Sequence, residues 1–141
     1  MNKLPSHLYL DEHDIPYEPK SFSPDTERGA ANFAHVIDFS ERQAVKTLIF
    51  QVDTGARNIK MADPDVIKET TGYLIGSIPA FGWQPSEFRS FLEASLIDEP
   101  ILGTGAGQWG EEIMMTPKNL IKASNVIVVN LTDREKSVSV E

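Results

Sequence analysis

Residues 72–83 read Gly-Tyr-Leu-Ile-Gly-Ser-Ile-Pro-Ala-Phe-Gly-Trp and are called the first glycine loop below. Three glycines, one proline and three aromatic residues fall within this stretch, and none of its side chains is charged. A surface loop of this length is normally polar, because solvent satisfies its backbone groups. An apolar loop rich in glycine instead predicts a backbone that turns sharply and is approached closely by something else. A bound ligand and another part of the fold both satisfy this prediction.

A second glycine-rich stretch lies further along the chain, at residues 103–110 (Gly-Thr-Gly-Ala-Gly-Gln-Trp-Gly), and is called the second glycine loop. Seven of the nine glycines lie between positions 72 and 110, so backbone freedom is concentrated in one region. The stretch lacks the Gly-Lys-Ser/Thr of a P-loop and the strand–loop–helix context of a dinucleotide-binding fingerprint. A tight hairpin connection and a phosphate cradle are the two interpretations that remain.

The strongest strand pattern covers Ala44–Val52. Side chains alternate between the two faces of a strand, so Lys46 shares a face with Leu48 and Phe50. A lysine on the more apolar face is costly to bury unless its amine reaches water, an anion or a ligand. Lys46 is therefore a candidate binding residue, and a lysine that extends to solvent from the strand end is the alternative.

Short helices and strands account for most of the remaining chain. Helices are predicted at residues 6–13, after Ser23-Pro24 with a buried face of Ala30, Phe33, Ala34 and Ile37, at 40–43, at 65–71 with Gly72 ending the helix, and at 118–123. Strands are predicted at 17–22 on a sheet edge, 58–61, 90–92, 112–115, and 126–129 with both faces covered. Without a repeat or a linker, this order predicts one α+β domain over residues 1–141, a mixed β-sheet with flanking helices. Residues 132–141 are expected to form a frayed tail.

Composition excludes several classes of function. The 141 residues carry a formal net charge of −8, which argues against tight nonspecific nucleic-acid binding and so against a DNA partner. Recognition of a single nucleic-acid end stays compatible with this charge. There is no cysteine, and the spacing of the three histidines indicates no metal site and no Ser-His-Asp hydrolase. Neither a signal pattern nor a membrane-length apolar run is present, so a cytoplasmic protein without cofactor is expected.

Five short motifs occur in an order and spacing that resemble the YbaK/ProX family, the aminoacyl-tRNA deacylases related to the editing domain of bacterial prolyl-tRNA synthetases. The motifs are Val45–Leu48, Thr71–Gly82, Ser95-Leu96, Gly105–Gly107 and Thr116–Leu120, and the resemblance runs from about Pro16 to Leu131. The chain departs from the family pattern in three places. Ala80 stands where a second proline is usual, Glu93 stands where aspartate is usual, and the segment between Val52 and Met61 is short by roughly a strand and a helix.

The resemblance implies hydrolysis in trans of the ester bond of mischarged aminoacyl-tRNA, with Cys- or Ala-tRNA(Pro) as the substrate. It also implies roles for particular residues. Lys46 and Gly76 match the catalytic positions, with Lys46 binding the tRNA 3′ end or assisting at the reacting centre. The substrate-binding positions are matched by Ser77, Ile78, Pro79, Phe81, Gly82, Gly105, Ala106 and Gly107.

Ester hydrolysis does not require a side-chain nucleophile at such a site. Backbone N–H groups can stabilise the developing oxyanion, and a ribose hydroxyl of the terminal adenosine can take part itself. The alternative is a noncatalytic module of the same fold that binds tRNA or a synthetase, which the short segment after Val52 motivates. The expected partners are a tRNA 3′ end and prolyl-tRNA synthetase, with no membrane, for a monomer or weak dimer.

Overall fold

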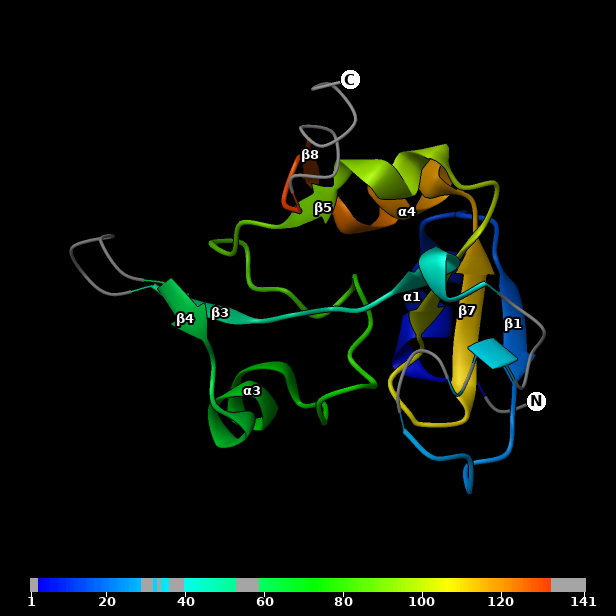
Figure 1. Ribbon diagram of the computed structural model, residues 1–141, viewed down its shortest axis with the longest axis horizontal. Coiled ribbons are helices and arrows are strands. Elements are labelled where there is room, and N and C mark those ends of the chain that lie inside the picture. The colour runs from blue at the N-terminus through cyan, green and yellow to red at the C-terminus, as the bar shows by residue number, and fades with distance from the viewer. Residues whose placement is uncertain (1–2, 29–31, 33, 36–39, 53–58, 133–141) are drawn as a thin grey trace.

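The main sheet of the computed structural model has four strands in the order β1-β7-β6-β2 (Figure 1). The structure describes residues 3–28, 32, 34–35, 40–52 and 59–132. The strands are β1 (Glu18–Ser21), β7 (Glu111–Met115), β6 (Leu102–Gly105) and β2 (Ala44–Val45). β7 runs antiparallel to both β1 and β6, and β2 runs parallel to β6. The sheet is therefore mixed, as predicted, and β1 lies at its edge.

Two smaller sheets and three helices complete the elements of the described residues. The antiparallel pair is β3 (Phe50–Val52) and β4 (Ile59–Met61), and the parallel pair is β5 (Phe91–Glu93) and β8 (Ile127–Val129). The helices are α1 (Pro5–Glu12), α3 (Pro64–Thr71) and α4 (Pro117–Ser124), with short 3₁₀ turns η1 (Glu41–Gln43) and η2 (Ala94–Asp98). None of these helices is long and apolar enough to cross a membrane. The α+β class predicted from the sequence is confirmed.

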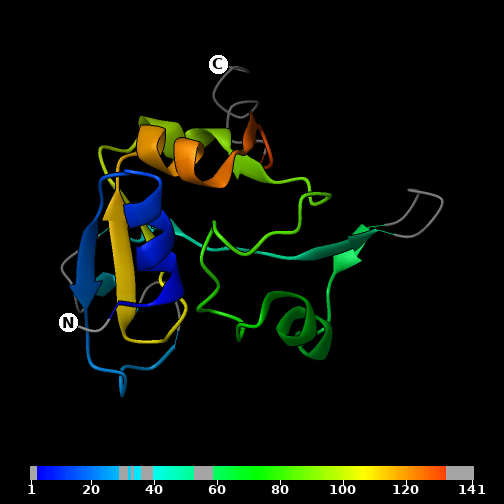
Figure 2. The same ribbon diagram turned by 180° about the vertical axis from the view of Figure 1, so that it is seen from behind.

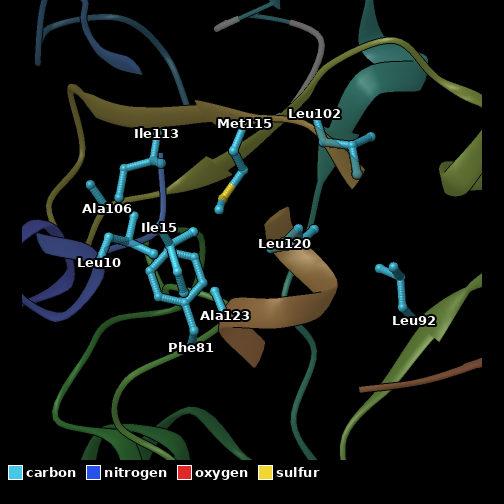
Figure 3. Packing of buried hydrophobic residues seen from close by; sticks show 10 residues of the cluster. All are labelled: Leu10, Ile15, Phe81, Leu92, Leu102, Ala106, Ile113, Met115, Leu120 and Ala123. Atoms are coloured by element: carbon cyan, nitrogen blue, oxygen red, sulfur yellow. The ribbon is translucent and has the colours of Figure 1, made fainter. Parts of the chain in front are cut away.

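The principal hydrophobic core lies between one face of the main sheet and helices α1 and α4 (Figure 2). Leu102 and Thr104 of β6 pair with Met115 and Ile113 of β7, so these side chains share that face. Phe81, from the end of the first glycine loop, inserts among them and is 1% exposed (Figure 3). The core therefore anchors one end of the first glycine loop.

Local sequence signals set the ends of the helices. The Gln43 side chain accepts from the Ser40 N–H at 3.3 Å, which is one half of a capping box, and Ser40 Oγ accepts from the N–H of Arg42 instead of Gln43. At the start of α4, Thr116 Oγ1 accepts from the Asn119 N–H at 3.2 Å. Helix α3 ends at Gly72, whose φ of +82° is a left-handed conformation that favours glycine. These predicted boundaries are confirmed to within a residue or two.

The prediction of one continuous strand over residues 44–52 is wrong for residues 46–49. β2 ends at Val45 and β3 begins at Phe50, because the ladder to β6 stops at Val45 and β3 finds its partner in β4 instead. In Figure 1 an extended segment carries the chain from the main sheet out to the β3–β4 pair. Lys46, Leu48 and Phe50 are exposed, so the more apolar face of the predicted strand faces solvent at these three positions.

Two further predictions concern strand 126–129 and the helix after Ser23-Pro24. The strand forms as β8, but Ile127 is 56% exposed, because its two-stranded sheet is too small to be covered on both faces. In the second case Asn32, Ala34 and His35 are helical and Ala34 is buried as expected. The other positions of that helix, the turn after Val52 and the tail from residue 133 lie outside the described residues.

The second face of the main sheet holds a buried carboxyl group. Glu112 is 4% exposed and pairs with Gly105 on one side and Lys20 on the other. Its Oε2 has no hydrogen-bond partner within the part of the chain that the structure describes. Burial raises the pKa of Glu112 from 4.5 to about 8, because desolvation disfavours the charged form. The sequence shows only a glutamate at the start of a strand, so burial could not be read from it.

Phe81→Ala should destabilise the fold by about 3–5 kcal/mol, because it leaves a cavity in the principal core. Urea denaturation measures the loss, and Phe91→Ala, at a 42% exposed ring, is the matched control with a much smaller expected change. A Phe81→Ala variant as stable as the wild type would contradict this placement.

Glu112→Gln should remove a pH dependence of stability. Below the unfolded pKa of 4.5 both states of the wild type are protonated, and between 4.5 and about 8 only the folded state keeps the proton. Wild-type stability therefore falls as pH rises through this window, by up to about 1.4 kcal/mol per pH unit. The advantage of Glu112→Gln over the wild type should grow from about pH 5 to about pH 8 in urea titrations. An advantage that stays constant would show that Glu112 ionises freely in the fold; Glu69→Gln, on exposed positions of α3, is the control.

Candidate aminoacyl ester site

The two glycine loops contact each other. A Cβ on Gly105 would lie 3.1 Å from the carbonyl oxygen of Ser77, and one on Gly107 would lie 2.8 Å from Cε1 of Tyr73. Both contacts join the second loop to the first. The close approach predicted from the glycines is therefore present, and at these two positions another part of the fold makes it.

Most of the first glycine loop beyond Gly76 packs into the protein. Ser77, Ile78 and Pro79 are buried, and Ile78 packs against Ala62 and Ile67 in a second, smaller core. The Pro79 carbonyl accepts from the indole N–H of Trp83 at 2.7 Å. Ile78, Pro79 and Phe81 therefore hold the loop in place, a structural role that the sequence prediction did not give them.

Gly76 lies at the exposed turn of the first glycine loop, with a φ of +92°. The next residue, Ser77, donates its N–H to the Leu74 carbonyl at 3.1 Å. Within the described residues the N–H of Gly76 has no acceptor. Gly76 is thus a predicted site residue of this loop that combines an exposed position with an available backbone donor among those described, and Gly82 is the other.

The second glycine loop is the connection of a hairpin between β6 and β7, as one of its two interpretations predicted. Ala106 is fully buried; its N–H donates to the Glu111 carbonyl at 3.1 Å, and its carbonyl accepts from Ser6 Oγ at 2.5 Å. Both polar groups of its backbone are therefore used by the fold. Gly105 and Gly107 face the first loop instead.

Strand pairing brings Lys46 to the end of the main sheet at which Gly105 lies. Val45 pairs with Thr104 in the parallel ladder, so Lys46 follows at the end where β6 continues into Gly105. Its side chain is exposed. Lys46, Gly105 and Ser77 therefore belong to one end of the main sheet, although they are far apart in sequence.

An arginine that the sequence reasoning missed contacts both loops. Nη1 of Arg28 donates to Ser77 Oγ at 3.4 Å, and its guanidinium carbon lies 5.2 Å from the centre of the Trp109 ring. A Cβ on Gly76 would lie 3.6 Å from the same Nη1. Arg28 stands in a polar segment with no periodic pattern, so only the tertiary contacts reveal it.

Two cavities among the described residues lie away from the contact between the loops. The better formed has a volume of about 240 Å³ and lies between the end of the first glycine loop and α4; it is lined by Tyr9, Gly82, Gln84, Pro85, Ser86, Phe88, Ser90, Ala123, Ser124 and Asn125. Gly82 is the only predicted site residue that lines it. Of the other candidates, Lys46 and Gly76 are exposed and Gly105 and Gly107 are half-buried, whereas Ser77, Ile78, Pro79, Phe81 and Ala106 are buried.

In the described part of the chain, no group of three or more His, Asp or Glu side chains is arranged so that it could hold a metal ion. The available groups are backbone N–H donors, one lysine and one arginine. Such a set binds anions and stabilises a developing oxyanion.

Solved structures resemble this fold along nearly the whole chain. The "hypothetical protein APE2540" matches with a TM-score of 0.79 at 17% identity, over 90% of this chain and 98% of that one. The structure of "a putative trans-editing enzyme for prolyl tRNA synthetase" matches with a TM-score of 0.74 at 20% identity, over 92% of this chain and 98% of that one. At such identities the matches establish the fold.

A family model identifies the chain beyond its fold. The model described as "Aminoacyl-tRNA editing domain" matches residues 39–123, which is more than half of the chain and includes both glycine loops and Lys46. This confirms the resemblance drawn from the short motifs. The chain belongs to the aminoacyl-tRNA editing domain family.

Proposed function

We propose that this protein hydrolyses, in trans, the ester bond of mischarged aminoacyl-tRNA, with Cys-tRNA(Pro) or Ala-tRNA(Pro) as its substrate. The observation that carries the proposal is the contact of the two glycine loops at Ser77 and Gly105, at the sheet end where Lys46 leaves β2. Membership of the editing family makes an aminoacyl ester the expected ligand of that place. The reaction would take place in the cytoplasm, with a tRNA 3′ end and prolyl-tRNA synthetase as partners.

The chemistry would rest on the backbone of the first glycine loop. The available N–H of Gly76 would donate to the oxyanion that forms when a water or a ribose hydroxyl attacks the ester carbonyl. Lys46 would supply a positive charge to the ribose-phosphate end. Ser77 and Gly105 would set the spacing between the loops, with Gly107 beside them.

Lys46→Ala should reduce deacylation of the preferred substrate at least about tenfold, because a cation at the substrate end is lost. The measurement is release of amino acid from Cys-, Ala- and Pro-tRNA(Pro), with Pro-tRNA(Pro) the slowest for the wild type. Lys60→Ala removes an exposed lysine of β4 and is the matched control, with wild-type rates expected.

A wild type that releases no amino acid from any of the three would overturn the proposed hydrolysis. Saturable binding of tRNA or of prolyl-tRNA synthetase without hydrolysis would then support the noncatalytic module. One observation favours that second candidate: Phe50, Ile59 and Met61 are all at least half exposed on one face of the β3–β4 pair. Exposed apolar surface of this kind is common where proteins bind partners.

Gly105→Ala should lower the turnover number by about tenfold to a hundredfold, because its new methyl group would press on the Ser77 carbonyl and shift the first loop. The matched control is Gly72→Ala, at a φ of +82° with open space around the added Cβ. That control should lose stability through backbone strain and keep its turnover number. Equal losses of turnover in the two variants would contradict a specific role for the loop contact.

A further inference from the structure

We infer that Arg28 and Trp109 form the binding site for the phosphodiester next to the terminal nucleotide of the substrate RNA. This inference rests on the proposed function and adds a residue that the family pattern did not assign. Its starting point is the position of one guanidinium group, in contact with both glycine loops at once. A guanidinium group at that junction lies next to any ligand that binds where the two loops meet.

Trp109 is held as a rigid platform for the arginine. Its indole N–H donates to the Thr26 carbonyl at 2.8 Å, and its ring meets the ring of Phe22 edge-on at 4.9 Å. The Phe22 N–H in turn donates to the Gly110 carbonyl at 2.8 Å. These contacts fix the indole relative to the end of β1, so the guanidinium stacked on it has a defined place.

Most of the hydrogen-bonding capacity of Arg28 is available. A guanidinium has five N–H donors, and the contact to Ser77 uses one of them at 3.4 Å, longer than the usual 2.9–3.0 Å. Arg28 is exposed, and no carboxylate of the described residues lies within ion-pair distance of it. In a chain with a net charge of −8, an unpaired arginine at a loop junction is suited to an external anion.

The chemistry of this pair suits a nucleotide, which brings a base that can stack as well as an anion. The planar fork of arginine binds two phosphate oxygens at once, and its flat face stacks on aromatic rings and on bases. Single-stranded RNA ends are commonly bound by such a combination of a cation and an aromatic ring. Lys46 lies at the sheet end that Gly105 shares, so the two cations would contact different parts of one RNA end.

The test is binding of a fluorescein-labelled RNA hairpin with a single-stranded CCA 3′ end, followed by anisotropy at several salt concentrations. Arg28→Ala should weaken binding about tenfold to a hundredfold and reduce the salt slope by about 0.7, the value for one lost phosphate contact on a single strand. Arg28→Lys should keep the slope and recover only part of the affinity, because the planar fork and the stacking are lost. A hairpin without the single-stranded end should bind weakly to the wild type and be insensitive to Arg28→Ala.

Arg89→Ala is the matched control, because Arg89 stacks on Phe91 at 5.5 Å in the same manner but its described contacts include neither glycine loop. It should bind the CCA hairpin like the wild type. Equal affinities and salt slopes for Arg28→Ala and the wild type would overturn the inference, and so would a wild type that does not bind the hairpin. Loss of binding in a variant with lowered thermal stability would also count against it, because it would show a structural role. If the wild type binds through Arg28 but hydrolyses no aminoacyl-tRNA, the inference stands and the proposed hydrolysis fails.

Discussion

The contact between the Ser77 carbonyl and Gly105 is the constraint on which the arrangement of this site depends. A side chain at position 105 would fill the space that the backbone of the first glycine loop occupies. The contact joins a strand of the main sheet to a loop that is otherwise packed by its own apolar side chains. It thereby sets how far apart Gly76, Arg28 and the start of the segment at Lys46 can be.

The first glycine loop is held by packing at both of its buried parts. Ile78 joins the small core with α3, and Phe81 joins the principal core beneath α1 and α4. These side chains explain why an uncharged loop is stable here, because the part of its backbone from Ser77 to Pro79 is buried against the rest of the protein. The exposed turn at Gly76 directly precedes these buried residues, and the proposed stabilisation of a transition-state charge would depend on the support that they give.

Predictions from local signals succeeded, and the errors arose where a distant partner decided the outcome. The boundaries of α3 and α4 follow from caps, prolines and a left-handed glycine, all of which act within a few residues. The strand at 44–52 has the right residues for a strand, but a strand forms only where a neighbour supplies hydrogen bonds. Arg28 and Glu112 were missed for the same reason, since a contact to both loops and burial in a sheet face are properties of the assembled fold.

By itself, the sequence determined the α+β class, most helix and strand positions, the two glycine loops and, through its short motifs, the editing family. The reason is that capping, side-chain alternation and glycine geometry are encoded within a few consecutive residues. Only the tertiary structure decided that Ile78, Pro79 and Phe81 serve as packing, that Lys46 faces solvent, and that Arg28 contacts both loops, at Ser77 and at Trp109. Those outcomes depend on which surfaces compete for burial once the chain is compact, and no local pattern records that competition.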